Sequence, residues 1–163
     1  MSRLDSFIRR MKAQRACLDW AAQAIADLPG PVFELGLGNG RTYDHLREIL
    51  PSRDIYVFEQ VIKAHPNCIP PDDRLFLGDA IEQLPIARDR LGEGAALVHT
   101  DLGTGDDAAN RRLAARLAEP LAGALRPGGI VLANIEIPVD RWTRLPEPEG
   151  VQKDRYFIYR DDG

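Results

Sequence analysis

The chain has 163 residues, which is enough for one domain with a sizeable core and too few for a second. An apolar content of 44% and a charged content of 28% are those of an ordinary soluble globular protein, and no apolar run is long enough to span a bilayer. The net charge of −4 disfavours a broad basic surface for phosphates, so we expect neither a nucleic-acid nor a membrane partner.

The first segment, residues 1–28, is predicted to be a long amphipathic helix. Apolar residues recur at helical spacing from residue 4 to residue 25, and Ser2 followed by Asp5 is typical of a capping box. The helix is expected to end at Pro29-Gly30. Five basic side chains against Asp5 give the first fifteen residues a net charge of +4, which we interpret as a solvated helix face.

The N-terminus and the cysteines indicate the cellular compartment. The first residues lack the apolar core and the small-residue cleavage site of a secretory signal. Cys17 and Cys68 lie far apart and form no CxxC pair, so the sequence predicts neither a disulfide framework nor a zinc site. We therefore expect a cytoplasmic protein with reduced thiols.

Five short apolar runs follow the first helix, and helix-like stretches separate them. The runs cover residues 32–36, 55–59, 74–78, 95–101 and 130–137. The helical stretches cover residues 42–50, 80–91 and 107–125, although Pro85 is expected to break or kink the second. Beyond a proline-rich segment, residues 156–159 are predicted to form an antiparallel edge strand.

This alternation of strand and helix predicts the fold class. We expect an α/β protein with a Rossmann-like, doubly wound, mostly parallel sheet and helices on both faces. Residues 1–163 form a single domain in this prediction, with an N-terminal helix (1–28), a binding core (32–137), and a C-terminal loop and edge strand (138–163). Ligands bind such sheets at the carboxyl ends of the strands.

A glycine-rich loop leaves the first predicted strand. Gly36, Gly38 and Gly40 alternate there, and glycine permits both left-handed backbone and close approach of a ligand to the main chain. A dinucleotide fingerprint needs its third glycine at position 41, where Arg41 stands, so a nicotinamide cofactor is disfavoured. No GK[ST] follows the glycines, so a P-loop is absent as well.

The loop resembles the first motif of the class I S-adenosylmethionine-dependent methyltransferases, in the form Glu34-x-Gly36-x-Gly38-x-Gly40. That resemblance implies a loop that holds the methionine end of S-adenosyl-L-methionine. The cofactor-binding residues that it implies in and beside this loop are Glu34, Gly36, Leu37, Gly38, Gly40 and Thr42.

The resemblance continues, in chain order, at the later strand ends. Glu59 matches the acidic residue that binds both ribose hydroxyls in the family, and Gln60 follows it. Asp79 and Ala80 are similar to the segment that recognises adenine. Asp101 closes the fourth run, where the family lines the methionine and acceptor pocket, so it is the candidate catalytic residue and a cofactor-binding one. The sequence LRPGG at 125–129 looks like the family's turn into the fifth strand.

Each of these residues also has a purely structural interpretation. The glycines fit a tight turn with no ligand, Glu59 fits a salt bridge or helix cap, and Asp79 fits the N-cap of the next helix. Asp101 fits a chain turn at residues 103–105. His99, two residues before Asp101, fits a core imidazole better than a general base.

The resemblance implies an enzyme that transfers the methyl group of S-adenosyl-L-methionine by in-line displacement to an acceptor, which we expect to be a small molecule. We expect no metal, since Asn134-Ile135-Glu136 lacks the Asp-Asn pair of the family's metal-dependent branch. The alternatives are a non-catalytic S-adenosyl-L-methionine-binding module, an aminopropyl transferase and a nicotinamide-dependent oxidoreductase. The first helix is a candidate interface for a homo-oligomer or a candidate cover for the binding pocket.

Overall fold

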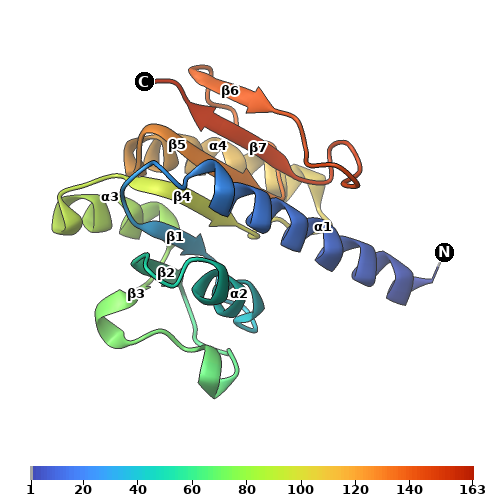
Figure 1. The fold of residues 1–163 in the computed structure, drawn as a ribbon, viewed down its shortest axis with the longest axis horizontal. Helices are drawn as coiled ribbons and strands as arrows, with labels where there is room; N and C mark the ends of the chain where they lie inside the picture. Colours follow the sequence, from blue (N-terminus) through green and yellow to red (C-terminus); the bar gives the residue numbers. More distant parts are fainter. Residues whose placement is uncertain (1) are drawn as a thin grey trace.

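The computed structural model describes residues 2–163, which form one seven-stranded sheet flanked by helices (Figure 1). The strands are β1 (Val32–Leu35), β2 (Ile55–Glu59), β3 (Leu75–Leu77), β4 (Ala95–Thr100), β5 (Leu125–Ala133), β6 (Trp142–Leu145) and β7 (Phe157–Asp161). The helices are α1 (Arg3–Ala24), α2 (Arg41–Ile49), α3 (Ala80–Leu91) and α4 (Asp107–Ala124), with two short 3-10 turns, η1 (Pro66–Cys68) and η2 (Asp72–Arg74). The strand order is β3-β2-β1-β4-β5-β7-β6. Strands β1 to β5 pair in parallel, and β7 pairs antiparallel with both β5 and β6.

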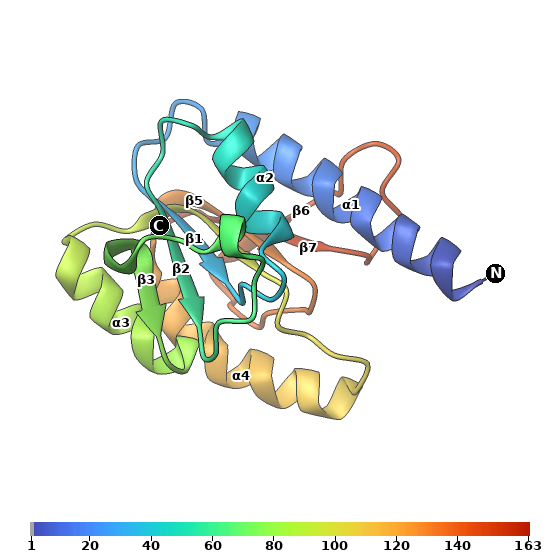
Figure 2. The same cartoon turned by 90° about the horizontal axis from the view of Figure 1, so that it is seen from below.

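Helices cover both faces of the sheet. Figure 2 shows α1 and α2 on one face and α3 and α4 on the other. Successive residues of a strand point to opposite faces, so Val32 packs in the core under α1 and α2, whereas Phe33 packs in the core under α3 and α4. The predicted α/β class, with a mostly parallel sheet and helices on both faces, is confirmed.

The helix α1 is anchored through its second half and extends past the sheet with its first half (Figures 1 and 2). Residues 2–10 are exposed, and the buried residues of α1 begin at Ala13. The predicted capping box is present, because the Asp5 backbone N–H donates to the Ser2 hydroxyl at 3.0 Å and the Ser2 backbone N–H donates to the Asp5 carboxylate at 3.2 Å. Within residues 2–163, none of the helices is both long and apolar enough to cross a membrane.

The predicted edge position of the C-terminal strand is wrong. β7 lies between β5 and β6, and β6 forms the edge of the sheet. The sequence does not mark 142–145 as a strand, because two of its four residues are exposed polar side chains and prolines flank it closely. The segment 138–163 is therefore a loop followed by an antiparallel hairpin rather than a loop and an edge strand.

Two proline-containing segments also differ from expectation. The helix α3 continues through Pro85, because Leu84 and Ala87 are fully buried against the sheet and this packing compensates for one missing backbone hydrogen bond. Residues 125–129 belong to β5 as an irregularity of the strand rather than preceding it as a turn. Ala95 pairs with Leu125 and Leu97 pairs with Ile130, so one residue of β4, Ala96, lies opposite four residues of β5, 126–129.

Candidate functional site

Two neighbouring cavities lie where the parallel strands β1, β2, β3 and β4 end. The first has a volume of about 440 Å³ and lies between the glycine loop, α1 and the end of β4. The second, of about 380 Å³, lies between the ends of β2 and β3 and helix α4. Gly36, Glu59 and Leu102 line both cavities, so the two adjoin at the expected edge of the sheet.

The three loop glycines have left-handed backbone but different neighbours. Their φ angles are 86° at Gly36, 51° at Gly38 and 83° at Gly40. An added Cβ at Gly36 would lie 2.8 Å from a methyl carbon of Leu102, and at Gly38 it would meet no atom within 4 Å. At Gly40 it would overlap Cys68, so this glycine permits close packing behind the loop, whereas Gly36 and Gly38 line the first cavity.

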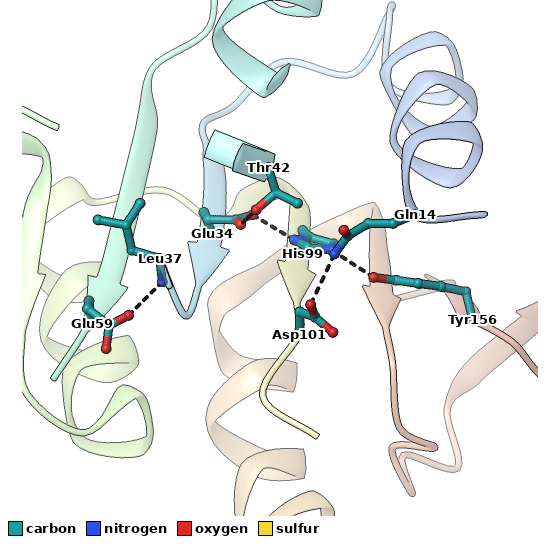
Figure 3. Close-up of polar contacts among 8 residues, drawn as sticks. All are labelled: Gln14, Glu34, Leu37, Thr42, Glu59, His99, Asp101 and Tyr156. Carbon is teal, nitrogen blue, oxygen red and sulfur yellow. Dashed lines mark hydrogen bonds and ion pairs between the residues drawn. The ribbon is translucent and has the colours of Figure 1, made fainter. Parts of the chain in front are cut away.

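Glu59 closes on this loop from the end of β2. One carboxylate oxygen accepts a hydrogen bond from the backbone N–H of Leu37 at 2.8 Å (Figure 3) and another from the backbone N–H of Gly38 at 3.1 Å. The other oxygen accepts from the N–H groups of Gln60 at 2.7 Å and Val61 at 3.4 Å. The four acceptor positions of the carboxylate are thus filled by main-chain donors, and the carboxylate is held at the junction of the two cavities.

Asp79 stands at the N-terminus of α3 and lines the second cavity. One oxygen accepts a hydrogen bond from the Ile81 backbone N–H at 2.9 Å, which makes Asp79 the N-cap of α3. The other oxygen lies 3.8 Å from a guanidinium nitrogen of Arg116 on α4. Gln60 and Ala80 line the same cavity, so four of the predicted residues, Gln60, Asp79, Ala80 and Glu59, come together there.

Asp101 follows β4 and lines the first cavity. The Gln14 side-chain amide donates to its carboxylate at 3.2 Å, which links Asp101 to α1 (Figure 3). The chain then turns through Gly103, whose backbone N–H donates to the Asn134 side-chain oxygen at 3.0 Å while its carbonyl accepts from the Asn134 amide at 3.2 Å. These contacts fix the loop after β4 against the end of β5.

Glu34 lies beneath the glycine loop rather than in a cavity. Its carboxylate is fully buried and accepts hydrogen bonds from the hydroxyl of Thr42 and from the Nδ1 atom of His99 at 2.7 Å (Figure 3). Tyr156 approaches the other ring nitrogen of His99, with its hydroxyl oxygen at 3.4 Å. Among the predicted residues, Thr42 lines the first cavity, whereas Glu34 supports the loop from below.

Burial and the neighbouring Glu34 carboxylate have opposite effects on the pKa of His99. Burial alone lowers the pKa of the imidazole, but the Glu34 carboxylate and its hydrogen bond outweigh burial and hold the pKa of His99 above its ordinary value. The raised pKa favours the imidazolium form of His99 in its pair with the buried Glu34 side chain on the neighbouring strand. Burial likewise raises the pKa of Tyr156, so its phenol remains protonated.

Sequence reasoning allowed the first helix to cover the pocket but did not identify which of its residues line the first cavity. Arg10, Met11 and Gln14 line it together with Arg41 at the start of α2. The one signal in the sequence was Gln14, a polar residue at helical spacing from the apolar residues Met11 and Leu18. In the structure it is 5% exposed and lies among the buried residues of α1. Within residues 2–163, no group of three or more His, Cys, Asp or Glu side chains is arranged to hold a metal ion.

Comparisons with known proteins agree with this geometry. The sequence model of a family described as S-adenosyl-L-methionine methyltransferase matches residues 1–161. No curated protein matches the chain. The crystal structure of an S-adenosyl-L-methionine methyl transferase from Silicibacter pomeroyi DSS-3 is 45% identical, with a TM-score of 0.92, and the match covers 99% of each chain.

More distant structures share the fold alone. CalS10, an amino pentose methyltransferase from Micromonospora echinaspora with S-adenosyl-L-methionine bound, is 17% identical, with a TM-score of 0.51 over 91% of this chain and 65% of its own. TrmN from Thermus thermophilus is 13% identical, with a TM-score of 0.54 over 88% of this chain and 48% of its own.

Proposed function

The chain belongs to a family of S-adenosyl-L-methionine methyltransferases, and from this premise we propose that it methylates a small-molecule acceptor at the two joined cavities. The observation that carries the proposal is the position of Glu59. Its carboxylate touches the glycine loop on one side and lines both cavities, which is where a ligand spanning the two would place its central hydroxyl groups.

The residues of the site fit an adenosyl sulfonium ligand. Gly36 and Gly38 both present main chain to the first cavity, Gly38 with no side chain nearby, and Glu59 offers a carboxylate for vicinal hydroxyls. When bound, the donor would supply an activated methyl group. The acceptor's lone pair would form a bond to the methyl carbon in line with the carbon–sulfur bond that breaks, and S-adenosylhomocysteine would be released. The protein then has to position the two partners rather than activate either one.

Glu59 binds the ribose in this proposal, and it has to exchange partners to do so. Its acceptor positions are filled by four backbone N–H groups, so two incoming hydroxyls displace some of these bonds. The main-chain donors that are released, those of Leu37 and Gly38, face the first cavity and become available to the ligand. The carboxylate thus holds the loop in a preorganised conformation until bonds to the ligand replace its bonds to the loop.

Asp79 and Ala80 bind the base, and Asp101 faces the reacting end. Asp79 holds its side chain fixed by capping α3, so the second cavity is formed before a ligand enters. Gln14 similarly fixes Asp101, whose free lone pairs point to a positive donor or to a proton on the acceptor. Glu34 and His99 support the loop from below and do not touch the ligand in this assignment, whereas Thr42 bonds to Glu34 and also lines the first cavity.

The volume of the first cavity and the position of α1 over it support the proposal that the acceptor is a small molecule. Helix α1 lies over it, and its volume of about 440 Å³ suits the methionyl end of the donor together with a small molecule. We also propose a cytoplasmic location, in keeping with the free thiols of Cys17 and Cys68.

Thermal shift and product formation test the proposal. S-adenosyl-L-methionine and S-adenosylhomocysteine should each raise the melting temperature, and NAD should not, because a ligand that binds only the native state stabilises it. A panel of small amines, carboxylates and phenols is then offered with the donor, and formation of S-adenosylhomocysteine is measured. Absence of any shift with both sulfur compounds would remove the proposed function. Binding without product from any acceptor would favour the non-catalytic module.

A further inference from the structure

Two arginines at the α1 side of the first cavity have no role in the site described above. We propose that Arg10 and Arg41 form a binding subsite for an anionic group, a carboxylate or a phosphate, of a ligand in that cavity. The inference rests on the proposed function, since it extends the same site.

The two guanidinium groups converge from different elements. Arg10 lies on α1 and Arg41 is the first residue of α2, and both line the first cavity. Both also approach the ring of Phe7, at 5.8 Å for Arg10 and 6.0 Å for Arg41 from guanidinium carbon to ring centroid. The Phe7 ring is 42% exposed, so it serves as a platform for the two cations rather than as part of the core.

Neither cation has a carboxylate partner among residues 2–163. Other arginines of the chain are paired, such as Arg47 with Asp44 at 2.5 Å and Arg141 with Asp161 at 3.3 Å. Two permanent positive charges beside one ring repel each other, and an anion placed between them removes that repulsion. The arrangement is therefore completed electrostatically by an anionic ligand group.

The start of α2 adds main-chain donors to this corner. Gly40 is the N-cap of the helix, and no side chain caps it. The first N–H groups of α2, beginning at Arg41, therefore keep their hydrogen-bonding capacity next to the two guanidinium groups. Asp101 lines the same cavity and repels an anion, so the anionic group is directed toward the arginines.

Two sources can supply such a group. One is the methionyl carboxylate of S-adenosyl-L-methionine, and the other is an anionic group on the acceptor. The arginine pair could bind the anionic group from either source. The two sources are distinguished by whether binding of the donor alone depends on the arginines.

Isothermal titration with two ligands tests the first source. S-adenosylhomocysteine carries the carboxylate, whereas 5′-methylthioadenosine has the nucleoside without it. If the pair binds the methionyl carboxylate, Arg10→Gln and Arg41→Gln each weaken binding of S-adenosylhomocysteine by about tenfold to a hundredfold and leave that of 5′-methylthioadenosine unchanged. Lys12→Gln, on the same helix, is the matched control for loss of one positive charge.

Inorganic phosphate tests the second source. If the pair binds an acceptor anion, the variants bind S-adenosylhomocysteine like the wild type. Phosphate then raises the melting temperature of the wild type and of Lys12→Gln, both saturated with S-adenosylhomocysteine, but not that of the double variant. Unchanged S-adenosylhomocysteine affinity together with an unchanged phosphate response in a folded double variant would overturn the inference. Failure of the wild type to bind S-adenosylhomocysteine would instead count against the proposed function.

Discussion

A carboxylate oxygen of Glu59 lies 2.8 Å from the backbone nitrogen of Leu37, so the acidic residue that ends β2 is bonded to the loop that leaves β1. The two strands are parallel neighbours, and their carboxyl ends therefore bring side chain and loop together. The same carboxylate thus orders the loop without a ligand and is proposed to bind the ligand when it arrives. Loss of Glu59 should affect both properties.

Glu59→Ala is expected to weaken S-adenosylhomocysteine binding by about 2 kcal/mol, roughly thirtyfold, because hydrogen bonds to a charged group are lost. Isothermal titration measures the affinity, and urea unfolding shows how much stability the loop loses with its anchor. Glu48→Ala is the control, since Glu48 is an exposed residue of α2. Wild-type affinity in folded Glu59→Ala would exclude Glu59 from the binding site.

The buried pair of Glu34 and His99 should be costly to break by removing either partner alone. Glu34→Gln leaves the imidazole without its carboxylate in a fully buried position, and we expect a loss of about 3–5 kcal/mol in the free energy of unfolding. His99→Gln should be similarly harmful. In a double-mutant cycle by urea unfolding, the combined variant should lose less than the sum of the two. Strict additivity would show that the two side chains do not interact.

The same pair predicts a pH dependence of stability. The pKa of His99 is raised in the folded protein above the ordinary histidine value of 6.5, so the folded state binds the proton more tightly than the unfolded state does. Its contribution is therefore complete below about pH 6.5 and declines as pH rises through the folded pKa. The difference in unfolding free energy between the wild type and His99→Gln should accordingly shrink from pH 6.5 upward. A difference that grew with pH would contradict a charged His99.

The strand and helix pattern predicts most of the fold, but not the contacts within the site. Alternating apolar runs indicate β1 to β5, whereas β6 has a single buried residue, Trp142, and escapes detection. Glu34 and Glu59 are both carboxylates within short apolar runs, yet one is fully buried and the other lines the cavities. Their difference depends on sheet register, which sets Glu34 beside His99. Likewise, Gln14 reaches Asp101 only because α1 docks over the strand ends, a tertiary contact that local spacing does not encode.

Methyl transfer should proceed without a metal ion. Asp101 accepts a hydrogen bond from Gln14, and the Asn134 side chain is hydrogen-bonded to the backbone of Gly103. Neither is therefore arranged with a second carboxylate to bind a divalent cation. Activity with an identified acceptor should therefore be the same after treatment with EDTA as before it. Activity that EDTA abolishes and Mg²⁺ restores would refute this expectation.

Gly38 and Gly40 should respond differently to the same added methyl group. In Gly38→Ala the new Cβ meets no atom within 4 Å, so stability falls by only about 1 kcal/mol for the left-handed backbone. In Gly40→Ala the Cβ overlaps Cys68 and lies 3.1 Å from its backbone carbonyl oxygen, so the loss should reach about 3 kcal/mol.

Ligand affinity should show the reverse order, because Gly38 lines the first cavity whereas Gly40 packs behind the loop. Urea unfolding and titration with S-adenosylhomocysteine on both variants give the two rankings. If Gly38→Ala bound as tightly as the wild type, the ligand would not approach the main chain at this position, and the loop glycines would serve the turn alone.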